Sequence, residues 1–130
     1  MPIAAILLPI AALIAPAPVE ICSTIFFEPD SAEIPRSAWQ ILDRVTGDVE
    51  DEGRPPVAIT GNSGATRFPG GTAALARRRA EAVRDYLVQH GVAARTIAIR
   101  PPDPAYALPE NRHLADAPEN QNAEICLVRE

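Results

Sequence analysis

Short apolar runs rich in β-branched residues alternate along this chain with longer stretches in which apolar residues recur every three or four positions. A short apolar run bounded by turn residues predicts a β-strand, whereas spacing by three and four predicts a helix with one buried face. The predicted strands are residues 21–27, 57–60, 96–99 and 123–128. Two helices are predicted between the first three strands, over about residues 35–50 and 72–90.

The sequence also marks where these helices begin and end. Pro35 suits the first turn of a helix, where its missing N–H costs nothing. The apolar stripe of the first helix is Ala38, Ile41, Leu42, Val45 and Val49. Thr72 is the predicted N-cap of the second helix. After His90, Gly91 is expected to end that helix in the left-handed conformation, with Val92 as its hydrophobic partner.

The order of elements predicts the fold class. Residues 101–121 contain five prolines and no periodicity, so a long surface loop is expected there, with at most one helical turn around residues 111–116. The chain therefore reads strand, helix, strand, helix, strand, loop, strand. Two helices packed on one face of a small mixed sheet, in the α+β class, would bury both apolar stripes.

The first 18 residues differ from the rest. They are apolar from Pro2 to Ala15, and the first charged side chain is Glu20. The run is too short to span a membrane and contains proline, whereas small residues near its end offer cleavage positions. We therefore expect residues 1–18 to be a signal peptide or an apolar N-terminal segment and residues 19–130 to form the domain. A buried helix or a disordered tail is the alternative.

Composition excludes several function classes. All 12 basic residues are arginine, and the net charge is -5. Without lysine there is no Walker-type phosphate loop and no Schiff-base chemistry, and an acidic chain is a poor binder of nucleic acid. The His and Cys residues form no closely spaced pair in sequence: His90, His113, Cys22 and Cys126. We expect no metal site, no cofactor and no enzymatic activity.

Arg79 is the residue that this pattern leaves unexplained. It stands between Leu75 and Val83 at i+4 spacing from each, so it lies near the buried side of the second helix. A guanidinium there needs an anionic or carbonyl partner, because an unpaired buried charge costs several kcal/mol. The partner could be Glu28, Asp30 or a loop carbonyl within the protein. Alternatively, it could be the carboxylate of a ligand.

The helix that carries Arg79 also resembles a known family. Its segment LARRRAEAVRDYL follows the pattern L-S-x-x-R-A-x-x-V-x-x-Y-L, with Ala76 in place of the serine. Together with IFFEPDSAEI, VAITGNSG, TIAI and NQNAEICLV, it is similar to the OmpA-like, peptidoglycan-associated domain of OmpA C-terminal regions, Pal and MotB. The resemblance covers about residues 20–130 and implies the order β-α-β-α-β-β.

The resemblance also implies a ligand site. In that family an Asp of the motif G-H-T-D binds the ammonium of diaminopimelate in the peptide stem of peptidoglycan, and the helix Arg binds its carboxylate. Here Gly61, Asn62, Ser63 and Gly64 stand at G-H-T-D, so Arg79 is kept and the Asp is missing. Thr72 and Asn120 stand at two further motif positions. The implied ligand-binding residues are Arg79, Gly64, Asn62, Ser63, Thr72 and Asn120.

The expected function follows from this incomplete site. A charge-assisted hydrogen bond contributes roughly 1.5–3 kcal/mol, so losing the Asp weakens binding by about 10- to 100-fold. The chain is therefore expected to be a weak or degenerate non-covalent peptidoglycan-binding module in the periplasm, associated with the cell envelope. The alternative is a protein-interaction module or structural scaffold that has lost peptidoglycan binding, with envelope proteins as partners.

Two cysteines lie in the first and last predicted strands. An exported chain with two cysteines invites a disulfide, because the periplasm is oxidising. The resemblance implies that the terminal strands lie side by side, which would let Cys22 and Cys126 meet. Two independent buried thiols are the alternative.

Overall fold

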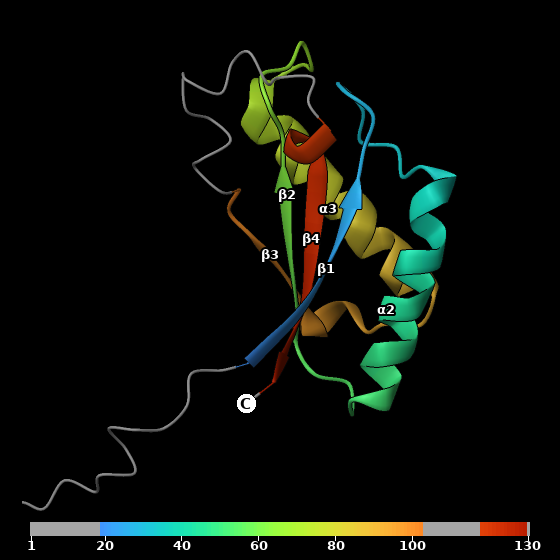
Figure 1. The fold of residues 1–130 in the computed structure, drawn as a ribbon. Helices are drawn as coiled ribbons and strands as arrows, with labels where there is room; N and C mark the ends of the chain where they lie inside the picture. Colours follow the sequence, from blue (N-terminus) through green and yellow to red (C-terminus); the bar gives the residue numbers. More distant parts are fainter. Residues whose placement is uncertain (1–18, 103–117, 130) are drawn as a thin grey trace, which may run out of the picture.

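The computed structural model of the chain describes residues 19–102 and 118–129 (Figure 1). Four strands and two helices make up its regular structure: β1 (Val19–Phe26), α2 (Trp39–Asp51), β2 (Val57–Asn62), α3 (Gly71–Gln89), β3 (Ile97–Arg100) and β4 (Asn122–Arg129). Short 3-10 turns cover Arg36–Ala38, Ala94–Thr96 and Pro118–Asn120. The predicted segment 1–18, the helical turn around 111–116 and His113 lie outside the described residues.

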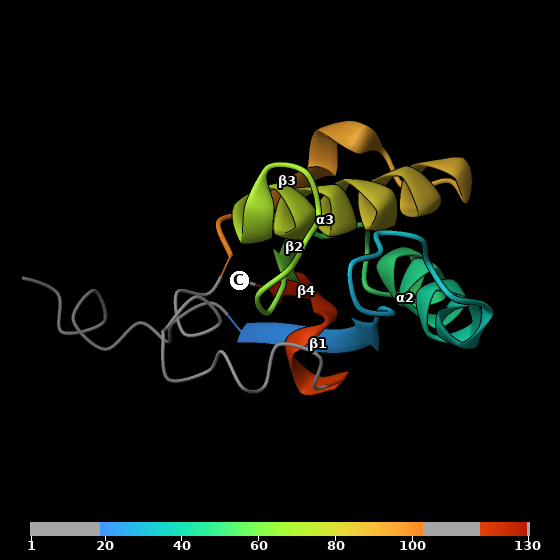
Figure 2. The same ribbon diagram turned by 90° about the horizontal axis from the view of Figure 1, so that it is seen from above.

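The strands form one mixed sheet in the order β1-β4-β2-β3. β4 is antiparallel to both of its neighbours, and β2 runs parallel to β3. Seen from above, both helices lie on the same side of this sheet (Figure 2). The predicted α+β class and the mixed sheet covered by two helices on one face are confirmed.

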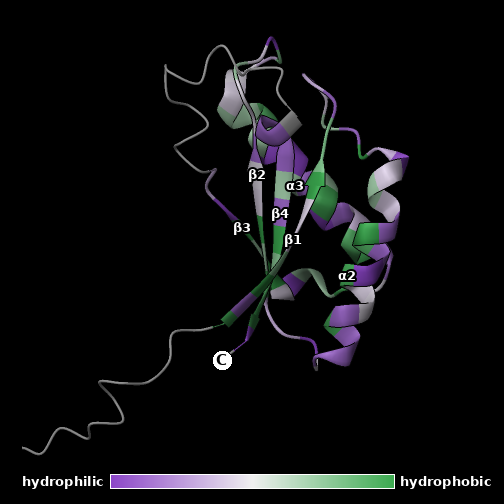
Figure 3. Ribbon diagram, viewed as in Figure 1, coloured by the Kyte–Doolittle hydropathy of each residue, from purple (hydrophilic) through white to green (hydrophobic). Residues whose placement is uncertain are grey.

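The core lies between the helices and the central strands. Alternate strand residues such as Ile25, Ile59 and Ile125 point toward the helices and are fully buried. From α2 the stripe Leu42, Val45 and Val49 packs against the same cluster. Along α2, hydrophilic and hydrophobic stretches alternate, as an amphipathic helix requires (Figure 3). Among the described residues, neither helix is long and apolar enough to cross a membrane.

The two ends of α3 are set by glycines. The predicted N-cap Thr72 is wrong: the N-cap is Gly70, with φ +90°, and the helix begins at Gly71, whose φ is +82°. Two consecutive positive φ values turn the chain before Thr72 is reached, and glycine adopts them without strain. The expected C-terminal stop is confirmed, because Gly91 has φ +102° and the N–H of Val92 donates to Leu87 O at 2.9 Å.

Gly61 on β2 lets α3 approach the sheet closely. A Cβ atom at this position would lie 1.9 Å from the carbonyl oxygen of Ala76 and 3.0 Å from the amide nitrogen of Ala80. These contacts are to helix backbone, which cannot move aside as a flexible side chain could. The distance between α3 and β2, and with it the position of every α3 side chain over the sheet, therefore depends on a residue without a side chain.

We expect Gly61→Ala to lower the free energy of unfolding by at least about 3 kcal/mol, because a methyl group forced against helix backbone displaces α3. Gly47→Ala is the matched control. Gly47 lies within α2 with nothing within 4 Å of the added Cβ, so alanine there should stabilise the protein by about 0.5–1 kcal/mol. Urea denaturation of both variants measures the difference, and equal stabilities would contradict the close-approach argument.

Candidate functional site

Arg79 is fully buried and bonded to three backbone carbonyl oxygens. Its Nε donates to Ser31 O at 2.8 Å, Nη1 to Asn62 O at 2.8 Å, and Nη2 to Glu28 O at 3.0 Å. The side chain is 0% exposed. One guanidinium thus joins three segments: α3, the end of β2, and the loop that follows β1.

The surroundings of Arg79 act on its charge in opposite directions. Burial lowers the pKa of Arg79 to about 10, and the negative charge of Asp30 opposes this shift. The guanidinium carbon also lies 5.1 Å from the centre of the Phe27 ring, in a cation–π arrangement. With a pKa of about 10, Arg79 is positively charged at neutral pH.

Of the partners considered from the sequence, the loop carbonyl is the one that the structure contains. Glu28 contributes its backbone oxygen to Arg79. Asp30 directs its carboxylate to the loop after β2: Oδ1 accepts hydrogen bonds from the Thr66 hydroxyl and, at 3.1 Å, from the N–H of Arg67. Three of the five N–H donors of this buried cation therefore have protein acceptors, one on each nitrogen.

Asp30 fixes the loop that carries the motif positions. Its backbone has φ +59°, a conformation that Asp tolerates better than most non-glycine residues. The hydrogen bond from Thr66, followed by that from the Arg67 backbone, lowers the pKa of the Asp30 carboxyl below its ordinary value of 3.8. The carboxylate therefore binds the 66–67 segment more tightly when it is ionised.

The other implied ligand residues lie near the end of β2 and the start of α3. Asn62 is 5% exposed, and its amide donates to Asn122 Oδ1 at 2.9 Å. Ser63 is 3% exposed, and its hydroxyl donates to Gly64 O at 2.7 Å. Gly64 and Asn120 are also buried, and Thr72 is half-buried in the first turn of α3. Most of these groups are enclosed by protein.

Asn122 and Asp30 are polar residues whose roles the sequence did not reveal. Asn122 Nδ2 donates to Glu119 O at 2.8 Å, so it connects Asn62 to the turn before β4. A polar residue at the start of an apolar strand was the only available signal for Asn122. No sequence pattern indicates the left-handed backbone of Asp30 that aims its carboxylate at Thr66.

A surface hollow of about 360 Å³ lies beside these residues, between α3 and the end of β3. Small and apolar residues line most of it, including Gly61, Ala73, Ala76 and Ile99, with Arg77 and Arg100 also in the wall. Neither Arg79 nor any other implied ligand residue lines it. This hollow therefore does not coincide with the implied ligand site.

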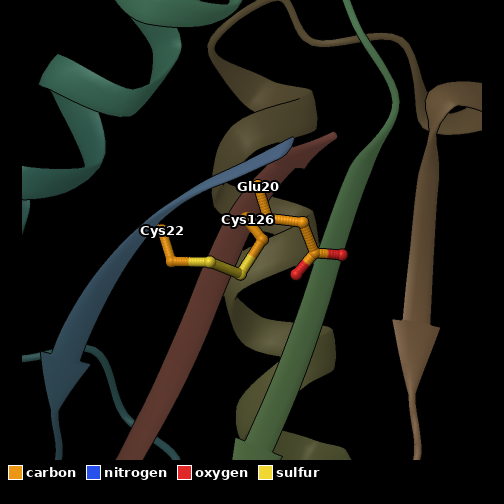
Figure 4. Close-up of side chains that lie close together, drawn as sticks. All are labelled: Glu20, Cys22 and Cys126. Carbon is orange, nitrogen blue, oxygen red and sulfur yellow. A yellow bond between two sulfur atoms is a disulfide. The ribbon is translucent and has the colours of Figure 1, made fainter. Parts of the chain in front are cut away.

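Cys22 and Cys126 are joined by a disulfide bond between the two terminal strands, with an S–S distance of 2.07 Å (Figure 4). They are direct partners in the β1–β4 register, and their Cα atoms are 4.0 Å apart. The ligand atoms of Glu20, Cys22 and Cys126 lie within 4.8 Å of one another. Because neither sulfur of a disulfide is a thiolate, this group contains only one metal-ligating anion, the Glu20 carboxylate.

The fold and the helix arginine define a class: small α+β domains of order β-α-β-α-β-β whose second long helix carries a buried Arg. The family model described as "OmpA family" matches residues 26–122. The chain belongs to the OmpA family, which confirms the resemblance. Among curated proteins, none matches the chain.

Solved structures agree with this assignment. The OmpA-like domain of FopA1 from Francisella tularensis subsp. tularensis SCHU S4 has a TM-score of 0.66 and 20% identity, covering 86% of this chain and 74% of that one. The cell wall anchor of the T6SS from Pseudomonas aeruginosa has a TM-score of 0.63 and 25% identity, covering 85% and 82%. The peptidoglycan-associated lipoprotein from Burkholderia pseudomallei has a TM-score of 0.57 and 21% identity, covering 82% and 89%.

We expect Arg79→Ala to lower the free energy of unfolding by about 3–5 kcal/mol, because it empties a fully buried site and removes the donor from the buried Asn62 O and from the part-buried Ser31 O and Glu28 O. Arg79→Met should lose nearly as much, since it keeps the apolar stem and removes only the guanidinium. Arg78→Ala is the control: this exposed neighbour makes a surface ion pair with Glu81 and should change stability by less than about 0.5 kcal/mol. A loss below about 2 kcal/mol for Arg79→Ala, measured by urea denaturation, would refute the structural role.

Asp30 should make stability depend on pH in the acid range. Its folded-state pKa is lowered, so its contribution is present above the ordinary value of 3.8 and is lost as pH falls through the folded value. The stability gap between wild type and Asp30→Asn should therefore be constant near neutral pH and shrink below pH 3.8. Thr66→Ala should show the same narrowing, because it removes the main cause of the shift. Denaturation curves across pH test this, and a pH-independent gap would contradict it.

Proposed function

We propose that this chain is a non-enzymatic domain of the cell envelope that binds peptidoglycan non-covalently and weakly. Membership of the OmpA family supports an envelope role, and the 25%-identical relative is named a cell wall anchor. One observation supports weak binding. The arginine of the family motif is present as Arg79, yet it is 0% exposed and donates to three protein carbonyls.

The arrangement of the site limits how strongly a ligand can bind. A ligand carboxylate reaches Arg79 only if the guanidinium gives up part of its bonding to the loop after β1 or to Asn62 O. The ammonium end of the ligand would meet Gly64, which has no carboxylate to offer. Each lost charge-assisted contact weakens binding by about 10- to 100-fold, so affinity depends on the backbone groups and on the density of the polymer.

The remaining expectations belong to the same proposal. The ligand is the peptide stem of peptidoglycan, the domain works in the periplasm, and residues 1–18 direct its export. Neither a cofactor nor a metal takes part. The disulfide between Cys22 and Cys126 supports an oxidising compartment, because such bonds persist there.

A second candidate function is an interaction module or scaffold that has lost peptidoglycan binding. Exposed apolar side chains on β1 favour it: Val19 is 58% exposed, Ile21 42% and Phe26 49%. Because β1 has only β4 as a neighbour in the described sheet, its edge can receive an envelope protein, with Val19 and Ile21 on one face and Phe26 on the other.

Sedimentation with isolated peptidoglycan sacculi tests the proposal. Wild type should bind weakly, and free diaminopimelate should compete. Gly64→Asp supplies the missing carboxylate and should raise affinity by about 10- to 100-fold.

Gly64→Ala is the matched control, because it adds a Cβ without charge and should bind as wild type does. Melting temperatures of all three proteins show whether each is folded. If folded Gly64→Asp binds no better than Gly64→Ala, the weakened-clamp proposal is wrong. If wild type does not pellet at any concentration, the scaffold function replaces it.

A further inference from the structure

The two sulfur atoms of the disulfide are not equally accessible. Cys22 belongs to β1, the edge strand of the described sheet, and is exposed. Cys126 belongs to β4, inside the sheet, and is 2% exposed. Both lie on the face of the sheet opposite the helices, because Ile125, next to Cys126, and Ile25, three residues after Cys22, point into the core and successive strand residues alternate between the two faces.

An ion pair lies on the far side of Cys126 from Cys22. Ala58 of β2 is the register partner of Cys126 on that side. Glu20 extends across β4 toward β2, and its carboxylate lies beyond the Cys126 sulfur (Figure 4). Arg100 of β3 binds this carboxylate through both terminal nitrogens, with Nη1 3.2 Å from Oε2. The pair therefore connects the two edge strands over the middle of the sheet.

This arrangement sets the direction of attack by a thiol. A thiolate displaces one sulfur of a disulfide along the S–S axis, from the side opposite the leaving sulfur, so access decides which sulfur reacts. A thiolate that attacks Cys22 approaches from beyond the edge strand β1. A thiolate that attacks Cys126 must approach over Ala58, where Glu20 and Arg100 lie.

The charged groups around Cys126 affect its protonation when the disulfide bond breaks. Glu124 Oε1 lies 3.3 Å from the Cys126 sulfur, on the same strand. Of the other groups facing this sulfur, Glu20 is paired with Arg100, whose charge also acts on Glu124, and Ala58 and Thr60 on β2 are uncharged. A carboxylate at this distance disfavours a thiolate and can accept a hydrogen bond from a thiol. Cys126 is therefore expected to leave as a thiolate and then to take up a proton, while access to the two sulfurs decides the direction of attack.

We propose that the disulfide is directional and that Cys22 is a site of S-thiolation by small-molecule thiols. The attacking thiolate forms a new S–S bond with Cys22, the Cys22–Cys126 bond breaks, and Cys126 leaves as a thiolate that takes a proton from water. The attacking sulfur is oxidised and the Cys126 sulfur is reduced. The mixed disulfide at Cys22 is long-lived, because Cys126 must lose that proton beside Glu124 before it can close the bond again.

The site of attack can be mapped with 2-mercaptoethanol, which is uncharged. The folded protein is treated briefly with this thiol, and the reaction is quenched with acid. The protein is then unfolded at low pH in the presence of a maleimide, which labels free thiols, and analysed by peptide mass spectrometry. We expect the thiol adduct on Cys22 and the maleimide on Cys126, in at least about tenfold excess over the reverse pattern. An even split, or an excess on Cys126, would overturn the proposal.

Two variants test the cause of this selectivity. Glu20→Ala and Arg100→Gln each remove the ion pair and should reduce the excess to about threefold or less, because the approach to Cys126 is opened. Glu33→Ala, an exposed acid in the loop after β1, is the control and should keep the wild-type ratio. An unchanged ratio in both ion-pair variants, with circular dichroism showing them folded, would contradict the access argument.

The lifetime of the mixed disulfide tests the role of Glu124. After removal of free thiol, release of 2-mercaptoethanol from Cys22 reports closure of the native disulfide. Glu124→Gln should speed this release by about tenfold at neutral pH, because the Cys126 thiolate is no longer opposed by a carboxylate. Equal release rates for Glu124→Gln and wild type would refute this part of the proposal.

Discussion

The fold depends on one buried cation. Arg79 reaches from α3 to the end of β2 and to the loop after β1, and its three hydrogen bonds end on backbone oxygens. Because the acceptors are backbone oxygens, these hydrogen bonds fix the path of the main chain as well as the position of the Arg79 side chain. The loop after β1, the end of β2 and the middle of α3 are therefore held together by a charged residue that is hydrogen-bonded inside the protein.

Close packing and polar bonding support the same region. Gly61 brings α3 against β2, so the Arg79 side chain can reach Asn62 O, one residue further along the strand. Asp30 holds the loop after β2 from the opposite side, through Thr66 and Arg67. A ligand that binds here must compete with bonds that maintain the fold. A scaffold can thus persist while affinity for peptidoglycan declines.

Much of the fold could be predicted from the sequence, because the spacing of apolar residues shows which side chains face the core. Short apolar runs indicated the strands, and apolar residues recurring every three or four positions indicated the helices. The strands, both helices and the Gly91 stop were predicted, although Thr72 was wrongly taken as the N-cap, since the positive φ of Gly70 is not visible in an apolar pattern. The partners of Arg79 remained open, because backbone carbonyls belong to every residue and leave no mark in the sequence. The left-handed Asp30 was hidden for a similar reason.

The most direct measurement of the central claim is NMR of the Arg79 guanidinium. If its N–H groups are bonded to protein carbonyls, the Nε–H signal of the free protein should be resolved and exchange slowly with solvent. The exposed Arg78 should exchange rapidly under the same conditions and serves as the internal reference. Exchange of Arg79 as rapid as that of Arg78 would show that the guanidinium is not bonded inside the protein and would contradict the account.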